Sequence, residues 1–367
     1  MKALLLVSEL EDYTIAFASG VARHLQVVLG VPRRRYAHLA PCFDPAVDLH
    51  LLDWPRHRSL SNPWFLRQLT RLIRRERPSL IHLLSNSTLW LNLAAPFWRP
   101  IPLVTTVHDV ELHPGDADTR VLPGWATDLM ARQSRHLVVH GEGLKRMALD
   151  RYSKSPDCVH VLSHPAIDRY AELARRRQMT RCPEDGTLRV LLFGRIFVYK
   201  GLEQLVRAES MLRDLLPNLR ITVAGRGDDP WIFRPLMGDA GRYDIRSRFI
   251  EDAEVAQLFL DADIVVLPYT EASQSGVLNL AAAFGKPVVV TDVGELRATV
   301  QPNGLGMVVQ PGDPVQLARA IRILAESKAL RTEFGTNALA WATGPNSPER
   351  VGAQAAAVYR EVVRACV

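Results

Sequence analysis

The stretch "LRVLLFGRIFVYKGLEQL", residues 188–205, places two positive charges between an apolar run and a helical pattern. Its first six residues are near-continuously apolar, which is typical of a parallel strand covered on both faces. Arg195 and Lys200 follow in a turn flanked by Gly194 and Gly201, where glycine lets the backbone approach a ligand. A guanidinium fork and an ammonium group at the end of a strand suit an anion such as a diphosphate. The alternative is two solvated surface charges beside a turn.

Similar apolar runs recur along the chain and alternate with helical patterns. This alternation is typical of βαβ units, so we predict two doubly wound α/β domains. The predicted strands are residues 2–8, 80–85, 102–109, 136–141 and 159–165 in the first half, and 188–194, 219–225, 245–250, 263–269, 286–293 and 305–311 in the second.

A polar segment over residues 171–187 separates the two halves and ends in Pro-Glu-Asp-Gly-Thr. We therefore predict a first domain over residues 1–175 and a second over 185–345. Residues 346–367 read as a C-terminal helix, with Ser347 as its N-cap and Pro348 as its first residue.

The composition narrows the possible partners and the compartment. The chain has 367 residues, of which 47% are apolar and 23% are charged, and this composition is typical of a globular protein. The net charge of +6 favours anionic partners, but no basic stripe interleaved with aromatic residues points to nucleic acid. The first residues read as a strand rather than a signal peptide, and no run approaches the roughly 18 apolar residues of a membrane span. The four cysteines are scattered, which is typical of free thiols in a reducing compartment. We therefore expect a cytoplasmic protein.

A second polar turn, "EASQSG" at residues 271–276, precedes an apolar helical pattern. The backbone N–H groups of Ser275, Gly276 and Val277 would lie at a helix N-terminus, which is a ready site for an anion. Side chains of Ser273, Gln274 and Ser275 would add donors. The alternative is ordinary capping of the helix by Ser273 or Ser275.

Two features of the first half each allow a structural and a functional interpretation. His108 ends a predicted strand, where its imidazole could serve a site or simply complete the core. The segment "NPWFLRQLTRLIRRERP", residues 62–78, combines apolar residues at helical spacing with five arginines. It reads as a helix on the sheet with a solvated basic face, or as a patch that contacts anionic lipid head groups.

Several motifs together resemble glycosyltransferase family 4. "FGRIFVYKGLEQLVRA", "ITVAGRGD", "FIEDAEVAQLFLDADIVVLPY" and "SGVLNLAAAFGKPVVVTDVG" resemble the family's nucleotide-sugar half, and "VHDVELHPG" and "VVHGEGLKRMALDRY" resemble its acceptor half. The resemblance is strong over residues 188–300, where the motifs follow the family's order, and weaker over 1–100. It implies GT-B architecture, with two Rossmann-like domains facing a cleft and a C-terminal helix that crosses back to the first domain.

The resemblance also implies an activity and roles for single residues. The activity is retaining transfer of a sugar from a nucleoside-diphosphate donor without an essential metal, and the donor half carries no DxD motif at the end of a strand. Arg195 and Lys200 match the residues that stabilise the leaving diphosphate, and His108 matches the one that contacts the donor sugar. Gly276 and Val277 fall in the segment that meets phosphate and sugar.

The sequence departs from the family at its paired glutamates. Many members carry two glutamates separated by seven residues before "GKPVV", and the direct count places them at Ala272 and Leu280. A slip of one residue pairs Glu271 with Asn279, whose amide could still bond a ribose hydroxyl. Leu280 falls on an apolar stripe typical of core. We therefore prefer Glu271 and Asn279 as the donor-binding pair.

These observations favour a glycosyltransferase that moves a hexose to a glycan or lipid-linked acceptor in surface polysaccharide or glycolipid synthesis. Two alternatives are a non-catalytic homologue that binds nucleotide sugars, suggested by the missing glutamates, and a nucleotide-sugar epimerase of the same architecture. A dinucleotide oxidoreductase fits less well, because "GRGDDP" at residues 225–230 does not complete a GxGxxG motif.

Overall fold

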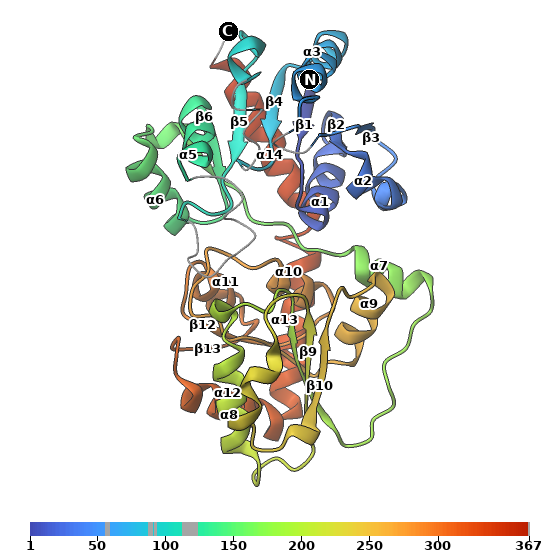
Figure 1. Ribbon diagram of the computed structural model, residues 1–367, viewed down its shortest axis with the longest axis vertical. Helices are drawn as coiled ribbons and strands as arrows, with labels where there is room; N and C mark the ends of the chain where they lie inside the picture. Colours follow the sequence, from blue (N-terminus) through green and yellow to red (C-terminus); the bar gives the residue numbers. More distant parts are fainter. Residues whose placement is uncertain (56–58, 87–90, 92–93, 112–123, 366–367) are drawn as a thin grey trace. The chain divides into compact units, whose positions relative to one another are not determined.

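The computed structural model describes residues 1–55, 59–86, 91, 94–111 and 124–365, which divide into two compact units (Figure 1). Unit 1 holds the described residues up to Pro165 and those from Pro345 onward, and unit 2 holds Ala166–Gly344. Each unit is built on one parallel sheet.

Unit 1 contains a seven-stranded sheet in the order β3-β2-β1-β4-β5-β6-β7. The strands are β1 (Lys2–Leu6), β2 (Gln26–Pro32), β3 (Val47–Leu52), β4 (Leu80–Leu83), β5 (Leu103–Thr106), β6 (His136–Val139) and β7 (Val159–Val161). The helices are α1 (Glu11–Ala22), α2 (Arg33–Tyr36), α3 (Asn62–Glu76), α5 (Gly124–Gln133), α6 (Glu142–Tyr152) and α14 (Pro348–Arg364), with 3₁₀ turns η1 (Ala37–Cys42), η2 (Ala95–Trp98) and η4 (Pro156–Cys158).

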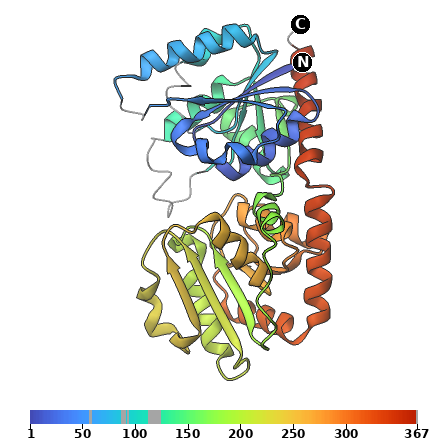
Figure 2. The same ribbon diagram turned by 90° about the vertical axis from the view of Figure 1, so that its right-hand side faces the viewer.

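Both faces of this sheet are buried, because successive strand residues point to opposite sides. In β1, Ala3 and Leu5 join the core that α1 and α14 cover, whereas Leu4 and Leu6 join the core that α3 covers. Helices accordingly lie on both sides of the sheet in Figure 2. This double cover is the reason that the strands read as continuous apolar runs.

Unit 2 contains a six-stranded sheet in the order β10-β9-β8-β11-β12-β13. The strands are β8 (Leu188–Phe193), β9 (Leu219–Gly225), β10 (Tyr243–Ser247), β11 (Ile264–Leu267), β12 (Val288–Thr291) and β13 (Gly306–Val309). The helices are α7 (Arg169–Arg176), α8 (Leu202–Leu212), α9 (Asp252–Asp261), α10 (Gly276–Ala283), α11 (Leu296–Asn303), α12 (Pro314–Glu326) and α13 (Lys328–Thr343), with 3₁₀ turns η5 (Val198–Lys200), η6 (Pro230–Leu236) and η7 (Ala240–Arg242). One core lies under α8 and α12 and the other under α9, α10 and α13.

The C-terminal helix α14 packs on α1, which confirms its predicted return to the first domain. Ser347 caps it by accepting a hydrogen bond from the Arg350 N–H, and Pro348 is its first residue, as predicted. The two helices approach closely because glycines meet: a Cβ on Gly352 would lie 2.1 Å from the carbonyl carbon of Gly20. A larger residue at either position would push the helices apart.

The unit boundary and two strands differ from the sequence-based expectations. The predicted first domain extends to residue 175, whereas α7 belongs to unit 2, where Arg169 bonds Asp252 of α9 at 2.6 Å. Strands β2 and β3 lie in a segment for which no strand was predicted. All of the strands that were predicted are present, and the predicted fold class of two doubly wound α/β domains is confirmed.

Candidate functional site

The loops after β8 and β11 lie side by side at the point where the strand order of unit 2 reverses. In open α/β sheets, ligands bind outside the carboxyl ends of strands at this switch point. The chain moves outward from β8 to β9 in one direction and from β11 to β12 in the other. Both polar turns singled out from the sequence therefore flank one position at the sheet edge.

The two loops are joined by close backbone contacts. The Thr270 N–H donates to the Tyr199 carbonyl at 2.8 Å. Gly201 has φ of +72°, and a Cβ there would lie 1.8 Å from the Pro268 carbonyl oxygen, so this position requires glycine. A Cβ on Gly194 would contact the Val277 side chain at 3.5 Å, which places the first turn against the start of α10.

Lys200 is held by two tyrosine rings. Its Nζ lies 3.7 Å from the ring centroid of Tyr269 and 4.9 Å from that of Tyr199, an arrangement that stabilises an ammonium group by cation–π attraction. Arg195 is exposed, with its guanidinium 5.7 Å from the Phe197 ring centroid. The loops thus present an ammonium group beside two rings and an exposed guanidinium beside one, and nothing in the sequence predicted the tyrosines beside Lys200.

The start of α10 is polar but is not capped by a serine side chain. The Ser275 hydroxyl lies 3.3 Å from the Tyr269 hydroxyl instead of capping α10, and buried Ser273 accepts the Glu295 N–H at its carbonyl. The Oε1 atom of Gln274 is buried without a hydrogen-bond partner. A buried amide oxygen without a partner can accept a hydrogen bond from an N–H or O–H group of a ligand. Ordinary serine capping therefore does not account for this cluster.

Asn279 and Leu280 are both buried in α10. Asn279 donates from Nδ2 to the Ser275 carbonyl at 3.1 Å, and Leu280 belongs to the core under α9, α10 and α13. Glu271, the proposed partner of Asn279, is exposed. The assignment of Glu271 and Asn279 to the ribose remains a prediction.

We expect the neighbouring substitutions Asn279→Ala and Leu280→Ala to act differently. Asn279→Ala should raise the donor Kd about tenfold, the equivalent of about one neutral hydrogen bond. Leu280→Ala should mainly lower the unfolding free energy, by about 2–5 kcal/mol. Calorimetric titration and denaturant unfolding of both variants measure the two effects. Weaker nucleotide binding in Leu280→Ala, with binding unchanged in Asn279→Ala, would show that the one-residue slip is wrong.

In unit 1, His108 lies just after β5 and is buried. Its Nε2 lies 2.9 Å from the Leu84 carbonyl, and its Nδ1 lies 3.1 Å from Nε2 of His140, which follows β6. Both ring nitrogens are thus engaged within the protein. His108 can bond a sugar through a ring nitrogen only if one of these contacts is exchanged, and nothing in the sequence around His108 predicted its pairing with His140.

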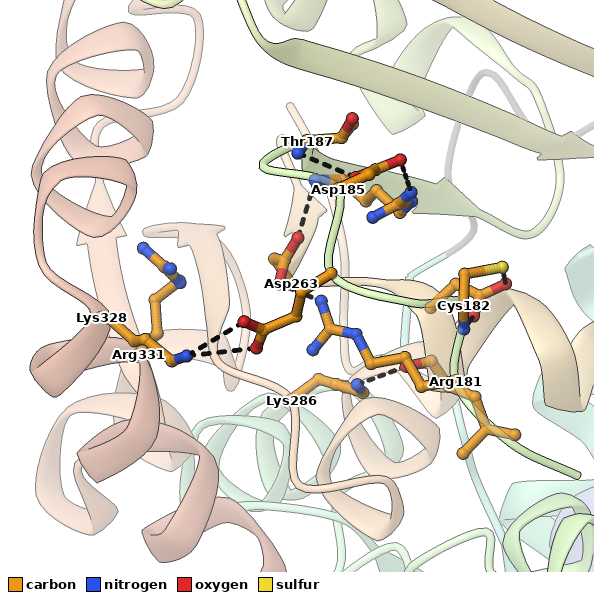
Figure 3. A network of polar contacts seen from close by, with 12 residues as sticks. Arg181, Cys182, Asp185, Thr187, Asp263, Lys286, Lys328 and Arg331 are labelled. Atoms are coloured by element: carbon orange, nitrogen blue, oxygen red, sulfur yellow. Dashed lines mark hydrogen bonds and ion pairs between the residues drawn. The ribbon is translucent and has the colours of Figure 1, made fainter.

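A second polar network lines a cavity of about 600 Å³ at the opposite, amino-terminal edge of the unit 2 sheet (Figure 3). Lys328 bonds Glu184 at 3.1 Å, and Lys286 donates to the Leu260 carbonyl at 2.8 Å. Arg181 is paired with Asp263. Burial lowers the pKa of Lys286 to about 8, and the Arg181 charge acts in the same direction. None of the predicted site residues lines this cavity.

One group among the described residues has the spacing of metal ligands. Donor atoms of Asp48, His50 and Glu76 lie within 4.8 Å of one another. The Glu76 carboxylate is already bonded to Lys2 at 3.2 Å and to Arg75 at 2.7 Å. Its charge is therefore balanced by side chains of the protein.

Comparison with known proteins identifies the family. The chain matches the family models "Glycosyltransferase Family 4" over residues 10–168 and "Glycosyl transferases group 1" over residues 187–327. It is 30% identical over 296 residues to D-inositol 3-phosphate glycosyltransferase 1 of Catenulispora acidiphila, covering 72% of this chain and 68% of that protein. The chain belongs to glycosyltransferase family 4. The resemblance derived from the sequence motifs is confirmed.

Other similarities of this family 4 chain are more distant or more partial. A D-inositol 3-phosphate glycosyltransferase of Pseudarthrobacter chlorophenolicus is 33% identical over 158 residues, 41% of this chain and 38% of that protein. The chain spans 62% of a third such protein, from Acidothermus cellulolyticus. The structure of Anabaena HepE in complex with UDP-glucose is 17% identical, with a TM-score of 0.73 and full coverage of both chains. That likeness shows the fold, which is GT-B.

Proposed function

We propose that this chain is a retaining glycosyltransferase that moves a hexose from a nucleoside-diphosphate sugar to a hydroxyl group of a glycan or lipid-linked acceptor. The main support is the pairing of the Lys200 loop with the start of α10 at the switch point of unit 2. The related D-inositol 3-phosphate glycosyltransferase supports transfer of a sugar, and the UDP-glucose bound to HepE belongs to the donor class that we propose.

The chemistry follows from the charge that develops when the sugar leaves. The diphosphate gains negative charge as the glycosidic bond breaks, so cations already in place lower the barrier. Lys200 is held in position by Tyr199 and Tyr269, and Arg195 adds a guanidinium that can bond two oxygens. The N–H groups at the start of α10 and the Gln274 side chain offer further donors and an acceptor.

The test is a transfer assay with the purified chain. A panel of nucleotide sugars, with and without EDTA, would be followed by mass spectrometry. We expect release of nucleoside diphosphate and transfer or hydrolysis of the sugar in both conditions, because the two cations already supply positive charge. Binding without turnover would favour the non-catalytic alternative, and interconversion of the donor sugar would favour an epimerase.

We also propose that α3 contacts the anionic surface of a membrane, on the cytoplasmic side, where a lipid-linked acceptor would lie. Within the described part of the chain, no helix is long and apolar enough to cross a bilayer. Helix α3 buries Phe65, Leu69, Leu72 and Ile73 and exposes its arginines together with Trp64, which is 57% exposed. A buried apolar face with a basic, tryptophan-bearing outer face suits peripheral binding to lipid head groups.

If α3 binds membranes, replacing Arg71, Arg74 and Arg75 by Glu should abolish binding to anionic vesicles. Each near-surface positive charge contributes about 1 kcal/mol to the free energy of membrane binding, so reversing three of them should exceed the total binding energy of a weakly bound peripheral helix. Vesicle sedimentation measures the effect, and binding of the unaltered chain should weaken as salt is raised. Substitution of exposed Arg319 and Arg322 on α12 of unit 2 by Glu is the matched control. Undiminished binding of the α3 variant would contradict the membrane proposal and identify α3 as a solvated surface helix.

A further inference from the structure

Four histidines are buried around the carboxyl ends of adjacent strands of unit 1. His82 lies in β4, and His108, His140 and His164 follow β5, β6 and β7. The rings of the last three contact Tyr13 of α1, with centroid distances of 4.7, 5.3 and 5.0 Å. The cluster therefore sits at the sheet edge where open α/β sheets bind ligands.

The hydrogen bonds of His108 and His140 can be counted atom by atom. Nε2 of His108 lies 2.9 Å from the Leu84 carbonyl, and Nδ1 of His140 lies 2.9 Å from the Leu162 carbonyl. A carbonyl oxygen only accepts, so both of these nitrogens must carry protons. The two remaining nitrogens face each other at 3.1 Å, and one of them must carry a third proton for this contact to be a hydrogen bond.

We propose that His140 is a positioning residue for His108: the two rings share one proton, and loss of this proton frees Nδ1 of His108 to accept a hydrogen bond from a sugar hydroxyl. The shared proton follows from the geometry alone, whereas the sugar contact rests on the proposed function. When the proton passes to solvent, two lone pairs face each other, and their repulsion opens the contact. His108 keeps its bond to Leu84, so the ring stays in place while one nitrogen becomes available.

The surroundings of the pair set the pH at which the proton is lost. Burial lowers the pKa of both imidazoles; the bonds to Leu84 and Leu162 act against it. The carboxylates of Glu9 and Asp109 favour the charged state of His108, and His82 and His164 disfavour that of His140. The net direction is downward, so the pair is protonated only in acid and neutral at higher pH. His108 is therefore engaged at low pH and available at neutral pH.

Nitrogen NMR of the full chain with ¹⁵N-labelled histidine tests the shared proton directly. We expect two of the four nitrogens of the pair to be protonated at about pH 8 and three at the acid end of the range in which the chain stays folded, with one midpoint common to both rings. His164→Gln, which alters a neighbouring buried imidazole without contact to a His108 nitrogen, should keep this shared step. Separate midpoints for the two rings, or an unchanged number of protonated nitrogens, would overturn the proposal.

Two substitutions of His140 distinguish positioning from simple packing. His140→Leu removes the second nitrogen that shares the proton, so in acid His108 must take up a proton alone in a buried site, and the acid limb of turnover, about tenfold per pH unit below the midpoint, should move to lower pH. His140→Gln supplies a neutral donor to Nδ1 and should lower turnover about tenfold at every pH. Equal pH profiles for both variants and the unaltered chain would overturn the positioning role. A chain that shows the shared proton by NMR but transfers no sugar would instead contradict only the proposed function.

Discussion

Replacing Arg195 or Lys200 by Ala should reduce sugar transfer by about a hundred- to a thousand-fold while the fold stays intact. Removing one preorganised group that stabilises developing negative charge costs about 3–4 kcal/mol of barrier. Lys200 should have the larger effect, because two rings, Tyr199 and Tyr269, lie against its ammonium group, whereas the exposed guanidinium of Arg195 lies near one ring, that of Phe197. Initial rates at saturating donor measure the change.

The matched control for this experiment is Arg207→Ala on α8. Arg207 is exposed and bonds Glu203 of the same helix at 2.8 Å. Its loss should change turnover less than about twofold, since a surface pair contributes only about 0.3–0.5 kcal/mol and touches no ligand. Near-normal rates in either site variant would contradict the assignment of the diphosphate to these loops.

Unit 1 should lose stability in mild acid while unit 2 changes little. The 11 histidines of the chain all precede residue 165, and Ala166–Gly344 of unit 2 contains none. Burial lowers the pKa of His82 to about 3 and that of His164 to about 4, and the charge of His108 acts in the same direction on both. The folded state therefore binds fewer protons than the unfolded chain below about pH 6.5, and stability falls as the pH drops.

The expected loss is large compared with the stability of a domain. Between about pH 6.5 and about pH 5, each of these two histidines costs about 2 kcal/mol, against a typical total of about 5–15 kcal/mol. Denaturant unfolding followed by circular dichroism at the two pH values measures the change. His164→Gln should reduce the acid loss by about 2 kcal/mol, the contribution of that one imidazole. His38→Gln should leave it intact, because the His38 side chain is exposed. Equal acid sensitivity in His164→Gln and the unaltered chain would contradict this explanation.

Much of the fold and of the unit 2 site can be predicted from local sequence patterns. The apolar run of β8, Gly194 and Gly201 predicted a strand, a tight turn and a helix, and all three are present. Strands β2 and β3 lie in a segment for which no strand was predicted. Strand β2 takes its place by pairing with β1, and β3 by pairing with β2; both are contacts between segments that are separated in the chain.

Local patterns also identified which loops matter, because parallel strands bring their carboxyl ends to one edge. They did not show how Lys200 is held, since Tyr269 lies on another loop and meets it only when β8 pairs with β11. They did not show that Asn279 is turned toward its own helix.

The state of His108 depends on the folded sheet most of all. Its sequence neighbourhood predicts a strand end and a possible ligand, but its two nitrogens bond Leu84 and His140, each distant in sequence. The register of β4, β5 and β6 determines that these atoms meet. An imidazole's tautomer and charge follow from the partners of both nitrogens. Residue type and spacing therefore determined the family, the sheets and the loops that carry charge, whereas long-range pairing determined which protons and hydrogen bonds those side chains have.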